Sequence, residues 1–202
     1  MGEDVHGGAL AKDVIVDTIG TSNGRLFNPF TTTAKDGLFN IRVIANALGN
    51  QCRYAGQTSR HYSVAEHCLL VERVVRERFM PFSTNFNVCR WALVHDAEEA
   101  YLPDLPAPYK KKAEMRWYRD AGARLMAEIA VWLGLEGEEP ALVKQVDIEI
   151  RGTERHWLFP PCPEWETSPP IPGIVCGVMS PDGAREAWLA RFFELWPERR
   201  TP

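Results

Sequence analysis

Helical spacing of apolar residues, interrupted by prolines, is the feature that most constrains the fold of this chain. Apolar side chains three and four residues apart share one face of a helix. Proline in a helix interior removes a hydrogen bond and clashes with the preceding turn, so the prolines separate the helical patterns. The pattern predicts an all-α protein of about six helices. These cover residues 41–48, 63–79, 86–101, 109–133, 140–158 and 182–195.

Two of these helices carry signals at their ends. Ser63 and Glu66 have the spacing of a capping box, which begins the second helix. Gly134 follows the last apolar residue of the long fourth helix and is expected to close it. These signals make the predicted boundaries firmer than periodicity alone would.

The segment 13–30 is different, because it contains two short β-prone runs. Val14–Thr18 and Arg25–Phe27 flank an Asn-Gly pair at positions 23 and 24. Asn-Gly between extended runs is typical of a β-hairpin. We therefore expect a small N-terminal hairpin on the outside of the helical bundle.

The domain organisation follows from the remaining segments. Residues 1–12 are expected to be a flexible N-terminus, and residues 13–202 a single domain. Prolines make residues 104–108 a loop and make 159–173 a Pro-rich surface loop. Too few residues follow the second loop to form a further domain.

Composition excludes several classes of protein. The 202 residues carry 23 Lys and Arg against 27 Asp and Glu, a net charge of −4, which argues against a broad nucleic-acid surface. Seven Trp and nine Phe exclude a disordered chain. No apolar run reaches the roughly 18 residues of a membrane helix, and the first 13 residues do not show the pattern of a signal peptide. Five cysteines without a Cys-x-x-Cys pair indicate reduced, buried thiols, so we expect a cytoplasmic protein.

Four side chains have the character of metal ligands. His67 and Asp147 lie on the apolar stripes of their helices, and His95-Asp96 directly follows a buried apolar run. A charged side chain in such a place is costly unless it is paired or binds a cation. Two imidazoles and two carboxylates suit one divalent ion: Mn, Fe, Co, Ni, Zn or Mg. Such an ion would lower the pKa of a bound water and so create a nucleophile.

Two further carboxylates extend this set. Glu99 lies four residues after His95, on the same face of the predicted helix, where it could orient or deprotonate a water. Asp104 lies in the following loop, where it could protonate a leaving oxygen, since neighbouring carboxylates raise one another's pKa. A single inward His is more often a hydrogen-bonded core residue, and a single Asp can cap a helix. The whole ordered set is much stronger evidence than either.

The ordered pattern His…His-Asp…Asp, at His67, His95-Asp96 and Asp147, resembles the HD-domain metal-dependent phosphohydrolases. Residues 95–110 are similar to the 5′-deoxynucleotidase branch of that family. In that branch a Glu three residues after the His-Asp pair and an Asp eight residues after it act in catalysis. Glu99 and Asp104 match both positions.

Residues 52–58 and 62–67 resemble phage-encoded members, including the dATP triphosphohydrolases of phages with modified adenine. The resemblance spans about residues 13–196, with Gln57 at a position where His is common. It implies a helical bundle and hydrolysis of the phosphate ester at a nucleoside 5′ oxygen. The products would be a deoxynucleoside with phosphate or with tripolyphosphate.

A phosphorylated substrate needs cations besides the metal. Lys110 matches a family lysine and Arg53 a family nucleotide contact, so we expect both to bind phosphate. Tyr54 either stacks on the sugar or base or packs within the protein. Lys111, Lys112 and Arg119 are more simply interpreted as a solvated helix face.

Three functions remain open from the sequence. A deoxynucleotide phosphohydrolase is favoured, acting on a small molecule without a nucleic-acid or membrane partner. The alternatives are hydrolysis of another phosphoester, such as a cyclic nucleotide or alarmone, and a non-catalytic metal-binding regulator. Family members often assemble, so we expect a homo-oligomer, either a dimer or a hexamer.

Overall fold

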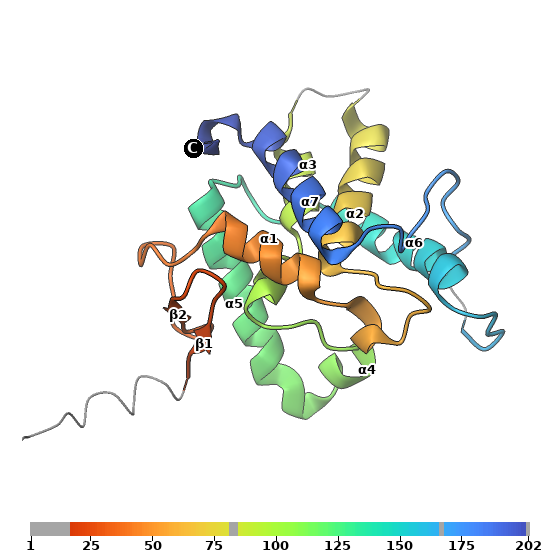
Figure 1. The fold of residues 1–202 in the computed structure, drawn as a ribbon, viewed down its shortest axis with the longest axis horizontal. Coiled ribbons are helices and arrows are strands. Elements are labelled where there is room, and N and C mark those ends of the chain that lie inside the picture. The colour runs from red at the N-terminus through yellow and green to blue at the C-terminus, as the bar shows by residue number, and fades with distance from the viewer. Residues whose placement is uncertain (1–16, 81–84, 166–167, 201–202) are drawn as a thin grey trace, which may run out of the picture.

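The computed structural model describes residues 17–80, 85–165 and 168–200, and over these it is an all-α bundle with a small hairpin, as predicted (Figure 1). The strands are β1 (Ile19–Gly20) and β2 (Leu26–Phe27). The α-helices of the described residues are α1 (Ile41–Asn50), α2 (Val64–Phe79), α3 (Asn87–Val94), α4 (Ala107–Lys110), α5 (Arg116–Leu133), α6 (Ala141–Leu158) and α7 (Pro181–Leu195). Short 3-10 turns cover Arg53–Gly56, Ala97–Ala100, Ala113–Met115 and Pro197–Arg199.

Helix α2 is central, because it packs against α3, α6 and α7, while α1 lies along α7 (Figure 1). Its apolar face is fully buried. The predicted stripe of α7 is also confirmed, since Trp188, Phe192 and Leu195 are all buried. Trp188 Nε1 donates to the Leu93 carbonyl at 3.1 Å and so ties α7 to the end of α3. This packing fixes α2, α3 and α6, the three helices that carry the candidate site.

The two helix ends with predicted signals form as expected, and α1 is capped as well. The Asn40 side chain caps α1, and the Ser63 hydroxyl accepts a hydrogen bond from the Glu66 N–H at 3.1 Å to begin α2. The Glu66 carboxylate accepts from the Val178 N–H at 3.0 Å, so it fastens α2 to the segment before α7. Gly134 closes α5 with φ +69°, a left-handed conformation that glycine adopts without strain.

Two predicted helices have different bounds. The helix expected over 86–101 ends at Val94, and after His95 and Asp96 the chain continues as the Ala97–Ala100 turn. The helix expected over 109–133 begins only at Arg116. Part of the predicted loop 104–108 is helical, because α4 begins at Ala107 with Pro108 in its first turn, where proline is tolerated.

The hairpin exists but is shorter and less peripheral than expected. Its strands pair Ile19 with Phe27 and Gly20 with Leu26. The first strand predicted at Val14–Thr18 is therefore wrong at its described end, and residues 14–16 lie outside the described part. Phe27 is buried and stacks on Tyr101 at 3.9 Å between ring centroids, so the hairpin closes one side of the core.

The described parts of the Pro-rich segment 159–173 contain no helix or strand, as predicted. The Ile171 N–H donates to Thr153 Oγ1 of α6 at 2.8 Å. Beside it the backbone of Ser168 lies directly on Gly152 of α6, where a Cβ would be 1.8 Å from the Ser168 oxygen. The segment is thus fitted against the helix that carries Asp147.

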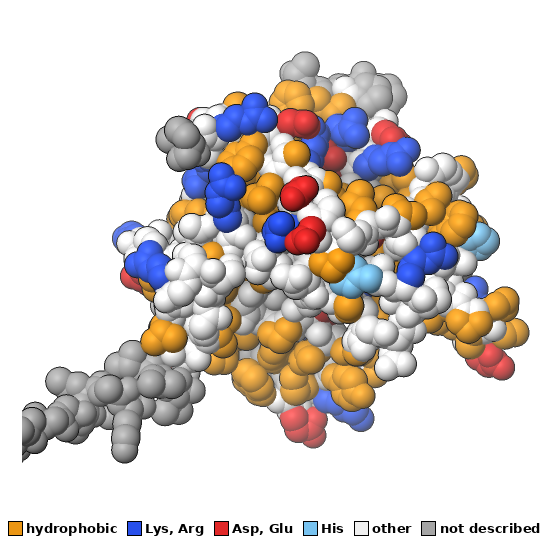
Figure 2. All heavy atoms as spheres, in the orientation of Figure 1, with side chains coloured by type: hydrophobic (Ala, Val, Ile, Leu, Met, Phe, Trp, Pro, Cys, Tyr) orange, Lys and Arg blue, Asp and Glu red, His pale blue; other side chains and the backbone are white. Residues whose placement is uncertain are grey.

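The expectation of buried thiols is confirmed only in part. All five cysteines are free, and Cys68, Cys89 and Cys176 are buried, but Cys52 and Cys162 are only half-buried. None of the described helices combines the length and the apolar character needed to cross a bilayer. On the face shown in Figure 2, acidic, basic and hydrophobic side chains are interspersed and neither charge dominates.

Candidate metal centre

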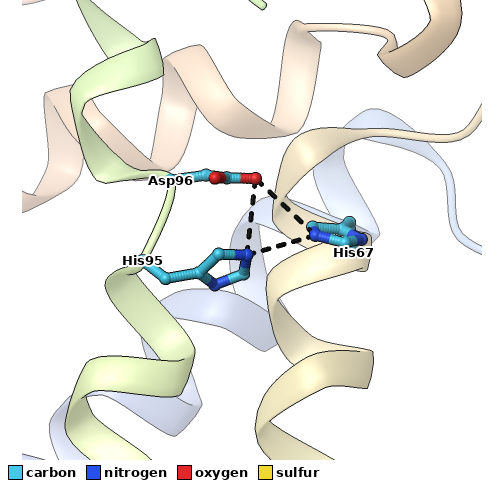
Figure 3. A group of neighbouring side chains, drawn as sticks. All are labelled: His67, His95 and Asp96. Carbon is cyan, nitrogen blue, oxygen red and sulfur yellow. Dashed lines mark hydrogen bonds and ion pairs between the residues drawn. The ribbon is translucent and has the colours of Figure 1, made fainter. Parts of the chain in front are cut away.

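His67, His95 and Asp96 form a group that can hold a metal ion, because one ligand atom from each lies within 4.8 Å of the others. The three side chains point toward one another from α2 and from the end of α3 (Figure 3). His67 Nε2 lies 3.2 Å from His95 Nε2, and Asp96 Oδ2 lies 3.6 and 3.5 Å from these two atoms. The group contains three of the four side chains that the sequence pattern predicts as ligands.

Both imidazole rings are oriented by hydrogen bonds on their other nitrogen. His67 Nδ1 donates to Glu154 Oε1, and His95 Nδ1 donates to the Ala92 carbonyl, each at 2.8 Å. A donor at Nδ1 leaves Nε2 of the neutral ring as an acceptor. Outer hydrogen bonds of this kind are the usual partners of metal-binding histidines. The donor set therefore fits a divalent cation of borderline hardness.

Asp147 lies beside this group, on α6. Its Oδ1 is 3.3 Å from His67 Nε2, and its Oδ2 accepts from Arg151 at 3.1 Å. Arg53 Nη1 donates to Asp96 Oδ2 at 3.2 Å. Both carboxylates thus meet basic side chains as well as the histidines.

The electrostatics keep these carboxylates ionised. Burial alone would raise the pKa of Asp96 and Asp147, but the adjacent histidines and Arg53 lower both below the ordinary value. Burial and Arg53 would lower the pKa of His67, but Glu154 and Asp147 raise it to about 9. A metal ion would have to displace that proton, so metal binding here is linked to pH.

Glu154 is a site residue that was not predicted. It is fully buried on α6, two turns after Asp147, and it contacts His67, Tyr54 and Tyr62. Its sequence signal was the same as that of Asp147, since it lies four residues after the buried Ile150 on the apolar stripe. Burial would raise its pKa, but Arg53 and His67 lower it to about 2.

A cavity of about 450 Å³ opens beside the metal-binding group. Its wall includes every predicted site residue except His67 and His95, so the structure brings all nine together. Glu99 reaches it from the Ala97–Ala100 turn rather than from a continued α3, which corrects the reason given for its position. Asp104 reaches it from the loop before α4, as predicted.

Lys110 bridges the two predicted catalytic carboxylates. Its Nζ donates to Glu99 Oε1 and to Asp104 Oδ1, both at 2.9 Å. Burial, Asp96 and Asp104 raise the pKa of Glu99 well above its ordinary value, although Lys110 opposes this. Glu99 therefore holds a proton more readily than an ordinary glutamate does.

The side of the cavity near Arg53 is aromatic. Tyr54 and Trp165 line it, and both pack edge-on against Phe159 with ring centroids 5.1 and 4.8 Å apart. Tyr54 also donates its hydroxyl to Glu154, so its ring is held by a buried carboxylate. Trp165 was not predicted, because nothing in the Pro-rich segment indicates which residue turns toward the cavity.

Comparison with known proteins finds two relatives, and both are uncharacterized. No family model matches the chain. It is 37% identical over 118 residues to YfdR, an uncharacterized protein of Escherichia coli strain K12, and 34% identical over 125 residues to an uncharacterized protein of Rhodobacter capsulatus. These matches cover 58% and 61% of the chain, and 60% and 61% of the two relatives. The matches therefore reach about three fifths of the relatives' length.

Proposed function

We propose that this protein is an HD-type metal-dependent phosphohydrolase that cleaves the 5′ phosphate ester of deoxynucleotides. The observation that carries the proposal is that two features of the site lie side by side. The His67–His95–Asp96 group can hold a metal ion, and Glu99, Asp104 and Lys110 lie together in the cavity beside it. Asp147 is proposed as the fourth ligand.

A divalent ion held by these ligands would supply Lewis acidity toward a phosphoryl oxygen and toward water. The chain's own cations supply the rest of the charge. Arg53 is half-buried beside Asp96, and Lys110 lies between Glu99 and Asp104. Both face the same cavity, so they can contact non-bridging phosphate oxygens as negative charge develops there.

Glu99 and Asp104 divide the proton transfers. Glu99 is the more buried of the two and lies in the turn that directly follows Asp96, so it orients the attacking water and, in its ionised form, accepts its proton. Asp104 comes from a separate loop and protonates the departing 5′ oxygen. Lys110 contacts both carboxylates and holds them in one place before the substrate arrives.

The aromatic side of the cavity supports a nucleotide as the substrate rather than a small phosphoester that lacks a base. Tyr54 and Trp165 offer ring surfaces to a sugar or a base. Stacking of a base on an aromatic ring stabilises binding by roughly 1–3 kcal/mol without selecting one base. A cavity of about 450 Å³ lies within the size range of small-molecule sites.

Hydrolysis assays on purified protein test the proposal. Deoxynucleoside and ribonucleoside mono- and triphosphates, cyclic nucleotides and alarmones are supplied with Co²⁺ or Mn²⁺, with and without a chelator, and the products are identified by mass spectrometry. We expect a deoxynucleoside with phosphate or tripolyphosphate, and no reaction with the chelator. Cleavage of only cyclic nucleotides or alarmones, or of nothing, would refute the proposal.

A variant pair tests the role of Glu99. Glu99→Gln should lose turnover by at least about 100-fold while the metal stays bound, because proton transfer to a positioned group contributes roughly 10²–10⁴-fold. Glu98→Gln is the matched control in the same turn. Burial and Asp96 raise the pKa of Glu98 to about 8, so an amide resembles its protonated form. Full activity in Glu99→Gln would remove Glu99 from the mechanism.

A further inference from the structure

Glu154 connects the metal-binding group to the neighbouring Arg53–Gly56 turn. Its Oε1 accepts from His67 Nδ1 at 2.8 Å and from Tyr62 OH at 2.9 Å, and it lies 3.4 Å from Arg53 Nε. Its Oε2 accepts from the Tyr54 hydroxyl. The carboxylate is fully buried, so water does not compete for these contacts.

An ionised carboxylate with no exposure would be costly if it lacked partners. Here two tyrosine hydroxyls, one imidazole and one guanidinium surround it, and hydrogen bonds to a charged acceptor are roughly twice as strong as neutral ones. Two of these partners, Arg53 and Tyr54, line the cavity. A third, His67, contributes Nε2 to the metal-binding group. One side chain therefore contacts both halves of the site.

The Arg53–Gly56 turn needs such an anchor. Tyr54 and Ala55 have φ values of 55° and 51°, in the left-handed region that non-glycine residues avoid. Each such residue costs on the order of 1 kcal/mol and persists only where its surroundings determine it. The hydroxyl of Tyr54 is held by Glu154, and the Arg53 N–H donates to the Tyr62 carbonyl at 3.0 Å.

We propose that Glu154 is a positioning residue that couples the two halves of the site, by orienting His67 toward the metal and by holding Arg53 and Tyr54 at the substrate. This inference rests on the proposed function for the nature of the bound groups. It adds that metal affinity and phosphate affinity depend on one buried carboxylate. Loss of Glu154 weakens both, and loss of a single contact weakens only its own half.

Binding of Co²⁺ alone tests the metal half. Glu154→Gln should bind Co²⁺ about 10- to 100-fold more weakly, the usual effect of removing a hydrogen-bond partner of a ligand histidine. The visible absorption spectrum of bound Co²⁺ should also change, because the His67 ring is no longer fixed. Glu72→Gln is the matched control, a buried carboxylate of α2 that pairs with Arg191 at 2.6 Å. It should bind Co²⁺ as the unaltered protein does.

Binding of inorganic tripolyphosphate at saturating Co²⁺ tests the substrate half. Glu154→Gln should weaken this binding by about tenfold or more, because Arg53 and Tyr54 lose their shared anchor. Tyr54→Phe removes only the hydroxyl that reaches Glu154. It should weaken tripolyphosphate binding and leave Co²⁺ affinity unchanged.

If Glu154→Gln does not fold, Glu154→Asp keeps the charge and shortens the side chain by one methylene. It should give a smaller loss of both affinities. Unchanged Co²⁺ and tripolyphosphate binding in the folded Glu154 variant would overturn the inference, as would a protein that binds no Co²⁺. Neither readout requires turnover. If the protein cleaves deoxynucleotides but the Glu154 variants bind Co²⁺ and tripolyphosphate normally, the proposed function stands and the coupling through Glu154 is refuted.

Discussion

Gly152→Ala provides a test of how closely the Pro-rich segment is fitted to α6. A Cβ at position 152 would lie 1.8 Å from the Ser168 oxygen, 2.6 Å from its carbonyl carbon and 3.0 Å from the Pro169 oxygen. These are backbone atoms, so a change of rotamer cannot relieve the contact. The segment must move away by about 1.5 Å to reach an ordinary van der Waals separation.

The size of the effect follows from two opposing contributions. Overfilling a well-packed site costs typically 1–3 kcal/mol. Replacing glycine by alanine inside a helix returns roughly 0.5–1 kcal/mol. The expected net loss is about 1–2 kcal/mol in the free energy of unfolding. For a domain of this length that corresponds to a decrease in Tm of roughly 2–8 °C.

Gly122→Ala is the matched control, because it makes the same change inside another helix. A Cβ there would meet only the Glu98 Cγ at 3.9 Å, an ordinary contact. The helical contribution is then unopposed, and Tm should rise by about 1–4 °C. Thermal unfolding followed by circular dichroism, with urea titration as a second measurement, compares the two variants. Gly152→Ala at or above the stability of the unaltered protein would refute the close fit.

Three other predictions concern the site. Asp96→Ala should lose the metal, and an unchanged metal content by elemental analysis would contradict its assignment as a ligand. The pKa of His67 lies at about 9 in the metal-free protein, above its ordinary value of 6.5. The stabilisation that protonated His67 provides is therefore complete below pH 6.5 and is lost as the pH rises through 9. The urea midpoint of the metal-free protein should fall over that range. A constant midpoint would show that protonated His67 is not stabilised by its neighbouring carboxylates. Trp165→Ala should raise KM for the nucleotide by about tenfold with little change in kcat, if the indole stacks on the substrate; equal KM values would exclude it.

The fold was largely predictable, because apolar residues recur at helical spacing and some helix ends carry local signals. Asn40 and Ser63 cap their helices through their own side chains, and Gly134 closes α5 in a conformation that suits glycine. The end of α3 at Val94 was not predictable. No glycine or proline lies between it and Tyr101, and at the interruption the ring of His95 donates to the carbonyl of Ala92.

The site was predictable where a polar residue interrupts an apolar stripe. His67 and Asp147 were found in this way, and Glu154 has the same signal. Side chains from loops follow no such rule. That Lys110 bridges Glu99 and Asp104, and that Trp165 lines the cavity, depend on chain paths that only the folded protein defines.

The interruption of α3 also has an electrostatic consequence. Aligned peptide dipoles give the C-terminal end of a helix a partial charge of about −0.5. Helix α3 ends at Val94, and His95 and Asp96 follow it immediately, so this negative end is directed at the metal-binding group. Were the helix to continue to Tyr101, as its sequence suggests, that end would lie two turns away. By stopping early, α3 adds its own dipole to the charges that attract a cation.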